Sequence, residues 1–230
     1  MRIFHLKGWA EKVVATLIAL FLLMMVFATF LPPRGYPDST RRITCANNLK
    51  QIGTAMLQYS QEYDEKFPPL EIRTRDSKIV TWRNVLKPFV KEIDLWKCRA
   101  NDASKIDALD GLPMGYETTD VGPIRRYGFA MSKVFAPTET ILAFEENAID
   151  ESAKSNGVSW NKDDGSDASL NVLFAGHLAT GNFLFADGHV KSMRPMATVG
   201  ANGNMWHVDT TAKVSTRALA KLKAATKTFE

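Results

Sequence analysis

The sequence predicts an α+β protein that has an N-terminal transmembrane helix, a proline break, and a second amphipathic helix packed on a mostly antiparallel sheet. Three observations predict this: an uncharged apolar run at 13–31, an apolar stripe with helical spacing over 45–63, and short strand-like runs before and after the turn residues Asp187-Gly188. A helix that buries one apolar stripe across a small sheet is a common α+β arrangement. We divide the chain into an N-terminal tail and transmembrane anchor (1–31), a Pro-rich linker (32–39), the α+β domain (40–212) and a basic C-terminal helix (213–230).

The first element is the run at 13–31, which holds nineteen residues and no charge. At about 1.5 Å per residue it is just long enough for a hydrocarbon core of roughly 30 Å. It is longer than the apolar centre of a signal peptide and ends in Phe30-Leu31-Pro32-Pro33, without a small-residue cleavage site. We therefore favour an uncleaved anchor in a lipid bilayer over a cleaved signal peptide or a buried core helix.

The orientation of this anchor follows from its short N-terminal tail. Basic residues flank the run on both sides, at Arg2, Lys7 and Lys12 before it and at 34–42 after it, so the positive-inside rule is nearly balanced. A short tail is easily left behind while a large domain is translocated. We expect a single-pass protein of the cytoplasmic membrane with its N-terminus inside and its domain periplasmic or extracellular.

The second helix should begin near Asp38 or Ser39, after the helix-breaking prolines 32, 33 and 37. Its apolar residues recur at steps of four and three, which is typical of one buried helical face. We expect this face to pack on the domain's own sheet, with a coiled-coil seam to another subunit as the alternative. The stripe consists of Cys45, Leu49, Ile52, Met56, Tyr59 and Tyr63.

The rest of the domain is predicted to contain short strands joined by polar loops. Asp187-Gly188 is a strong two-residue hairpin signal, so residues 189–193 should return antiparallel to the strand before it. The remaining predictions are a short helix or turn at 82–90, strands at 95–98, 126–131, 140–144, 172–174 and 182–185, loops at 99–123 and 147–169, and a basic helix at 213–227.

The order of these motifs resembles the type IV pilin-like proteins of the type II secretion pseudopilin class. The resemblance lies in an apolar N-terminal helix followed by Cys45-Ala46-Asn47-Asn48-Leu49-Lys50-Gln51-Ile52-Gly53 and by Tyr59-Ser60-Gln61-Glu62-Tyr63-Asp64. More narrowly, the chain resembles a bacterial subgroup of this family whose C-terminal part carries a His followed, after nine residues, by Asp-Gly. In this sequence these residues are His177 and Asp187-Gly188. The resemblance covers roughly residues 10–193 and also includes Phe67-Pro68, Trp82 and Cys98. It implies a pilin-like fold, and partners among other pilin-like subunits or the secretion or pilus machinery.

One departure from that family concerns processing at the N-terminus. The prepilin peptidase site of the family reads G-F-T-L-I-E or close to it, whereas this chain has Gly8-Trp9-Ala10-Glu11-Lys12-Val13. The Glu is too near the Gly, and a Lys lies beside it. We therefore expect neither efficient cleavage nor N-methylation by a prepilin peptidase.

The hairpin motif supplies the first candidate site, formed by His177, Asp187, Gly188 and His189. Imidazole and carboxylate groups suit Zn²⁺, and a His with an Asp also suits acid–base catalysis. However, Asp is favoured in tight turns because its side chain bonds nearby backbone N–H groups. We therefore favour a structural role for the motif, with a metal site and an enzyme using His177 and Asp187 as alternatives.

Two further candidates are an acidic loop and the two cysteines. Asp163, Asp164 and Asp167 offer oxygen ligands of the kind that Ca²⁺ prefers, although their spacing fits no standard calcium loop, and a solvated loop is the simpler interpretation. Cys45 lies on the buried stripe and Cys98 at the end of a predicted strand, so the pair forms either one disulfide or two separate buried thiols. The sequence indicates no required cofactor, with Ca²⁺ or Zn²⁺ as alternatives.

The predicted function is a non-enzymatic, structural or assembly component of a type II secretion or type IV pilus-like system. No nucleophile–base motif, phosphate-binding Gly loop or metalloprotease helix is present. The formal charge of +4 is spread along the chain, which argues against nucleic-acid binding. The alternative is a membrane-tethered extracytoplasmic binding module that does not polymerise.

Overall fold

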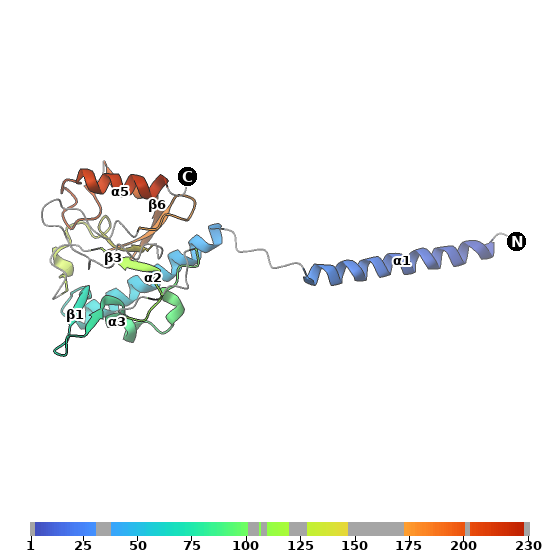
Figure 1. The fold of residues 1–230 in the computed structure, drawn as a ribbon, viewed down its shortest axis with the longest axis horizontal. Coiled ribbons are helices and arrows are strands. Elements are labelled where there is room, and N and C mark those ends of the chain that lie inside the picture. Colours follow the sequence, from blue (N-terminus) through green and yellow to red (C-terminus); the bar gives the residue numbers. More distant parts are fainter. Residues whose placement is uncertain are drawn as a thin grey trace. The chain divides into compact units, whose positions relative to one another are not determined.

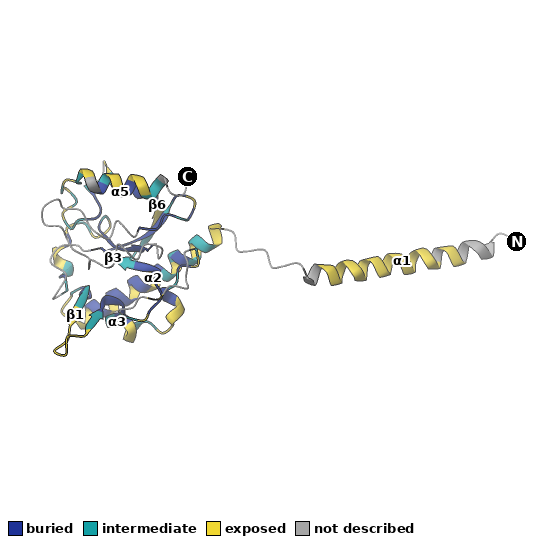
Figure 2. Cartoon of the chain, viewed as in Figure 1, coloured by how far each residue is buried: buried dark blue, intermediate teal, exposed yellow. Residues whose placement is uncertain are grey.

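The computed structural model describes residues 3–30, 38–100, 106, 110–119, 128–146, 173–200 and 203–227. The chain divides into two compact units, Met1–Tyr36 and Pro37–Glu230 (Figure 1). The first unit contains the single helix α1 (Ile3–Phe30). Its large apolar side chains between Val13 and Phe27 are exposed (Figure 2). Among the residues whose burial the structure describes, no helix is at once long enough and apolar enough to cross a membrane.

The long helix of the second unit is α2 (Asp38–Glu62), which begins at the predicted residue. It buries one face, shown in dark blue in Figure 2, because its apolar residues recur with helical spacing. The prediction was wrong for the last residue of the stripe, Tyr63, which lies beyond the end of the helix and is 51% exposed. Its ring stacks on that of Tyr59, with 4.2 Å between the ring centroids. The buried apolar residues are Cys45, Leu49, Ile52, Ala55, Met56 and Tyr59.

The α+β class with antiparallel sheets is confirmed. The main sheet has the order β3-β4-β5-β6, and all three neighbouring pairs are antiparallel. The pairing of β5 with β6 forms the predicted hairpin, in which Gly188 adopts a φ of 89° that favours glycine. Its connection holds four residues, 186–189, rather than two. The strands are β3 (Tyr116–Thr118), β4 (Ile141–Glu145), β5 (Gly181–Phe185) and β6 (Val190–Met193).

The sheet is covered on both faces by helices, α2 on one side and α5 (Thr216–Lys227) on the other (Figure 1). Successive side chains of a strand point to opposite faces. Leu184 of β5 accordingly belongs to the core beneath α2, whereas Phe183 belongs to a second core with Leu222 of α5. The strand is therefore buried along its whole length, which explains why it reads as an apolar run.

The smaller elements surround this central layer. Trp82 starts α3 (Trp82–Leu86), whose N-cap Thr81 accepts a hydrogen bond from the backbone N–H of Asn84. The other elements are the hairpin of β1 (Glu71–Arg73) with β2 (Ile79–Thr81), the pair β7 (Val199–Gly200) and β8 (Gly203–Asn204), and the 3₁₀ turns η1 (Lys87–Phe89), η2 (Ile93–Trp96), η3 (Met131–Lys133) and η6 (Pro195–Thr198).

Five predicted elements need correction. The segment 95–98 is not a strand, because its first two residues belong to η2, which ends at Trp96. The predicted loop at 99–123 contains β3, which is too short to give a periodic signal. In the predicted strand at 126–131, Ala130 forms an isolated bridge with Lys66, and Met131 already starts η3. In the predicted strand at 172–174, Leu173 likewise forms a single bridge with Glu146. The C-terminal helix begins at Thr216 rather than at residue 213.

Candidate functional site

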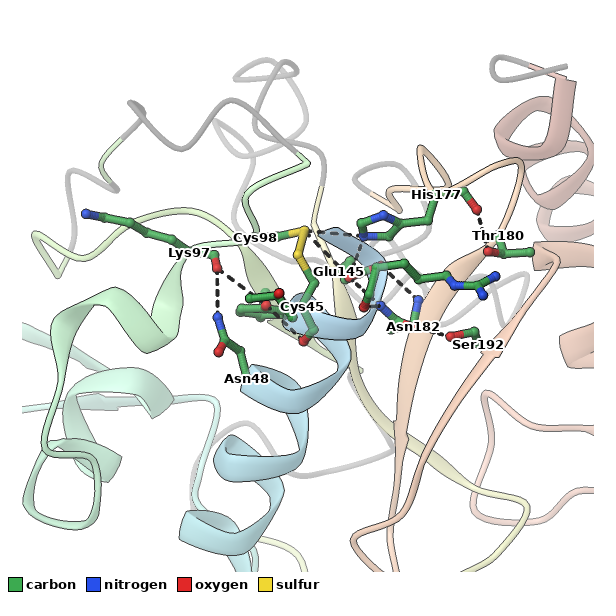
Figure 3. Close-up of polar contacts among 12 residues, drawn as sticks. Cys45, Asn48, Lys97, Cys98, Glu145, His177, Thr180, Asn182 and Ser192 are labelled. Atoms are coloured by element: carbon green, nitrogen blue, oxygen red, sulfur yellow. Dashed lines mark hydrogen bonds and ion pairs between the residues drawn. A yellow bond between two sulfur atoms is a disulfide. The ribbon is translucent and has the colours of Figure 1, made fainter. Parts of the chain in front are cut away.

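Four buried side chains converge from four different parts of the domain. Cys45 comes from α2, and Cys98 follows η2 by two residues. Glu145 is the last residue of β4, and His177 lies in the turn that precedes β5. Each of the four is at most 1% exposed. The cluster therefore lies where the long helix meets the sheet (Figure 3).

Cys45 and Cys98 form a disulfide, with their Cα atoms 5.1 Å apart although the two residues are separated by 53 positions in the sequence. The bond ties α2 to the segment that carries η2. Closing a loop of this length stabilises a fold by about 4 kcal/mol in the chain-entropy model. Gly115 lets this segment approach closely, because a Cβ there would lie 2.6 Å from the backbone N of Cys98.

Glu145 and His177 form a buried acid–base pair beside the disulfide. The His177 Nε2 atom lies 3.0 Å from Glu145 Oε1. It also lies 3.5 Å from Cys98 Sγ, and the same sulfur is 3.6 Å from Glu145 Oε1. The His177 Nδ1 atom has no hydrogen-bond partner among the described residues. Of the two ring nitrogens of His177, Nε2 therefore makes the polar contacts, and it faces both the carboxylate and the sulfur.

The carboxylate of Glu145 is fixed by Asn182 of β5. The backbone N–H of Asn182 donates to Glu145 Oε2 and its side-chain amide donates to Oε1, both at 2.8 Å. The same amide donates to the backbone carbonyl of Arg42 at 3.1 Å, and its oxygen accepts from the hydroxyl of Ser192. Asn182 therefore connects α2, β4, β5 and β6 through one side chain (Figure 3).

Tyr116 lies against the same cluster from β3. Its hydroxyl donates to the backbone carbonyl of Cys45 at 3.1 Å. Burial, and then the negative charge of nearby Glu145, raise the pKa of this phenol well above its ordinary value of 10.0. Asn48, one turn after Cys45, donates to the backbone carbonyl of Lys97 at 3.1 Å. Polar contacts thus hold both ends of the disulfide.

A tight turn with an unusual backbone holds His177. Reciprocal backbone bonds join His177 and Thr180, at 3.2 Å and 3.1 Å, and the Thr180 hydroxyl donates to the His177 carbonyl. The two central residues, Leu178 and Ala179, have φ values of 56° and 60°. This is the pattern of a type I′ turn, which normally takes Asn and Gly at these positions. Strain of this kind persists only where the surrounding structure enforces it.

The other residues of the hairpin motif lie away from His177. The five residues of β5 span roughly 15 Å and separate His177 from Asp187. Asp187 accepts from the ring of His189 at 2.6 Å and from its backbone N–H at 3.1 Å, while that ring stacks on Phe185. The structure therefore does not bring His177, Asp187 and His189 together as ligands. Asp163, Asp164 and Asp167 lie outside the described residues.

Sequence reasoning missed Glu145 and Asn182. The only available signal was position: Glu145 is a charged residue directly after the predicted strand 140–144, and Asn182 opens the predicted strand 182–185. A carboxylate at the end of an apolar run is expected to pair when it is buried. Nothing in the sequence identified His177 and the disulfide as its neighbours.

Comparisons with known proteins give a match to one family model, over part of the chain. The family SBP_bac_10, described as protein of unknown function (DUF1559), matches residues 38–108, which run from the start of α2 to beyond Cys98. This family is associated with pilin-like and pseudopilin-like proteins. No curated protein and no solved structure matches the chain.

Proposed function

We propose that this chain is a non-enzymatic, membrane-anchored, pseudopilin-like protein that serves as a structural or assembly component of a type II secretion or type IV pilus-like system. The observation that supports this most is the order of its elements. An apolar helix comes first, and a second long helix then packs across a four-stranded antiparallel sheet. The DUF1559 match begins at the first residue of that second helix.

The proposal assigns membrane retention to α1. Its sequence contains the uncharged run 13–31, and the large apolar side chains that the structure describes between Val13 and Phe27 are exposed. In water such a surface is unfavourable by about 25 cal/mol per Å² of apolar area. Lipid, or the matching helices of other subunits, removes this cost.

The proposed location of the domain is outside the cytoplasmic membrane. The Cys45–Cys98 disulfide supports this, because disulfides persist mainly in oxidising compartments. The bond also supports a structural rather than catalytic role for the cluster. Glu145 and His177 are 0% and 1% exposed. The carboxylate of Glu145 is engaged with His177 Nε2 and with Asn182 rather than presented to a substrate.

A tethered binding module that does not polymerise is the second candidate. Two sequence features favour it: the altered prepilin site at Gly8-Trp9-Ala10-Glu11-Lys12-Val13, and the prolines 32, 33 and 37, which lie where a typical pilin continues its helix. Both candidates share the anchor and the fold, and they differ in whether α1 contacts other subunits.

Chemical cross-linking of native membranes tests the proposal. The full chain should give products with pilin-like subunits that are identified by mass spectrometry. Products should be reduced when Leu20 and Met24 are both changed to Ala, which shortens the side chains but keeps α1 uncharged and in the membrane. They should be kept when two exposed residues of the domain, Lys50 and Gln51, are changed to Ala. A chain that stays monomeric in its membrane while known pilins cross-link would support the binding module instead.

Intact mass measurement tests the processing step separately. We expect the first eight residues to remain on the membrane form, because Glu11 and Lys12 do not fit the peptidase site. A mass that corresponds to loss of these eight residues with a methylated Trp9 would contradict the expectation and would strengthen the assembly role.

A further inference from the structure

The cluster of Cys45, Cys98, Glu145 and His177 has a second property besides its disulfide. One ligand atom from each of the four residues lies within 4.8 Å of every other. Two thiolates, one imidazole and one carboxylate are all ligand types that zinc accepts. All four side chains are buried, so their convergence does not reflect a chance group of exposed acids.

The measured separations are close to those of a tetrahedral zinc site. Bonds of about 2.3 Å to sulfur and about 2.0–2.2 Å to nitrogen and oxygen place neighbouring ligand atoms roughly 3.4–3.6 Å apart around a tetrahedron. Cys98 Sγ lies 3.5 Å from His177 Nε2 and 3.6 Å from Glu145 Oε1, and the latter two atoms are 3.0 Å apart. These three atoms therefore already form nearly one triangular face of such a site.

Cys45 supplies the fourth corner once the disulfide is opened. Two thiolates on one tetrahedral zinc lie about 3.8 Å apart, which is farther than a disulfide allows and less than the distance between the two Cα atoms, 5.1 Å. Turning the side chains about their Cα–Cβ bonds changes the sulfur positions by this amount. The backbones of α2 and of the Cys98 segment can stay in place.

The carboxylate is held in position without a metal. Asn182 donates two hydrogen bonds to Glu145, and Asn182 is itself held by Ser192 and by the carbonyl of Arg42. Partners of this kind orient metal ligands, and their loss typically costs 10–100-fold in metal affinity. The domain therefore contains the support that a metal site needs.

We propose that reduction of the Cys45–Cys98 disulfide converts this cluster into a Zn²⁺ site with Cys45, Cys98, His177 and Glu145 as ligands. A phosphine reductant supplies the two electrons: it takes an oxygen atom from water to become a phosphine oxide, and the two protons of that water give two thiols. Zn²⁺ then displaces the two thiol protons, and the imidazole proton moves from Nε2 to Nδ1, which has no hydrogen-bond partner among the described residues. The ion binds both sulfurs, the Nε2 lone pair that this frees and one carboxylate oxygen.

The two redox states would hold the same four segments together by different bonds. In the oxidised domain the disulfide joins α2 to the segment after η2, and hydrogen bonds hold β4 and the turn before β5. In the reduced domain a single ion would join all four. This inference goes beyond the proposed function and does not depend on where the domain is located.

The test uses the full chain in detergent micelles, reduced with a phosphine under anaerobic conditions and then freed of the reductant. Zinc is titrated against a chromophoric chelator, and Co²⁺ is used as a spectroscopic substitute. The reduced protein should bind one equivalent, with the visible bands of tetrahedral Co²⁺ and a thiolate-to-cobalt charge-transfer band. The oxidised protein should bind none.

Variants separate the folded site from incidental binding by two thiols. His177→Gln should lower the zinc affinity of the reduced chain by at least 100-fold and Asn182→Ala by about 10–100-fold. His189→Gln, on the same hairpin, should leave it unchanged. Equal affinities for His177→Gln and His189→Gln would overturn the proposal. An octahedral Co²⁺ spectrum of the reduced wild type would also overturn it, whether or not any variant folds.

Discussion

At the scale of single residues, Glu145 is the centre of the polar interior. It is fully buried and accepts hydrogen bonds from the backbone and side chain of Asn182 while lying 3.0 Å from His177. A buried carboxylate is stabilising only when such partners compensate its lost hydration. The architecture around β4 and β5 therefore depends on one charge that no sequence motif marks.

Replacing Glu145 with Gln should destabilise the oxidised domain by about 3 kcal/mol. The new amide presents a donor to one of the Asn182 donors and leaves His177 without a charged partner. Chemical unfolding of the full chain in micelles measures this change. Glu62→Gln, at the exposed end of α2, is the matched control and should stay within about 0.5 kcal/mol of the wild type. Equal stabilities of the two variants would show that the charge of Glu145 is not needed.

Tyr116→Phe should cost about 1 kcal/mol near neutral pH, because the hydroxyl no longer donates to the Cys45 carbonyl. The pKa of this phenol is higher in the folded than in the unfolded chain. Its contribution to stability is thus complete below about pH 10 and is lost as the pH rises toward the folded pKa. Unfolding measured from pH 9 to 11 should fall less steeply for the variant, and Tyr63→Phe serves as control. If the free energy of unfolding of Tyr116→Phe falls more steeply with pH than that of the wild type, Tyr116 is not the group whose raised pKa makes the stability depend on pH.

The residues that sequence reasoning identified are those with a motif or a periodic position. His177 belongs to the His-x9-Asp-Gly motif, and Cys45 lies on the helical stripe. Glu145 and Asn182 were missed because their roles arise from the pairing of two strands, β4 and β5, which brings together residues 37 positions apart. Spacing along the chain contains no information on such a contact until the strand register is known.

At the scale of elements, the turn 177–180 is where the local sequence disagrees with the backbone. Leu178 and Ala179 occupy left-handed positions that cost L-residues roughly 1–2 kcal/mol each. Leu178 is also 64% exposed, so burial of its side chain does not offset the cost of its backbone conformation. Two contacts hold the turn in this left-handed conformation. They are the backbone hydrogen bonds between His177 and Thr180 and the contact of the His177 imidazole with Glu145.

Replacing Leu178 and Ala179 together by Asn and Gly should stabilise the domain by about 1 kcal/mol, because this pair suits a type I′ turn. Thermal unfolding of the oxidised chain measures the gain. Ala179→Val provides the opposite control and should destabilise, since a β-branched residue is strongly disfavoured at this φ. If the Asn-Gly variant is less stable than the wild type, the two side chains make contacts that outweigh the strain.

Elements with a sustained period were predictable, and short ones were not. The stripe of α2 agrees with the structure because burial on one face imposes a period on the sequence. The hairpin of β5 with β6 was predictable from its turn residues, Asp187-Gly188, instead. The segment 95–98 reads as a strand, yet η2 forms there so that Leu95 and Trp96 can both be buried. β3 is three residues long and is placed by its pairing with β4, which no local pattern reveals.

At the scale of the whole molecule, the chain consists of two compact units, to which the proposed function gives separate roles. The first, Met1–Tyr36, contains α1 and its exposed apolar surface. The second contains every residue of the buried cluster and both hydrophobic cores. The disulfide closes a loop that lies entirely within the second unit. Stability of the domain and retention in the membrane should therefore respond to different substitutions.

Changing Leu20 and Met24 of α1 to Lys should abolish membrane retention and leave the unfolding of the domain unchanged. Two charges within the run 13–31 are costly in a bilayer, at about 2.5–3.5 kcal/mol each on insertion scales. Alkaline carbonate extraction of native membranes measures retention, and the wild type should stay in the pellet. The reciprocal control, Cys45→Ala with Cys98→Ala, should stay in the pellet too, although its domain unfolds with a free energy lower by about 4 kcal/mol. Release of the wild type by carbonate, or of the cysteine variant alone, would contradict this division of roles between α1 and the domain.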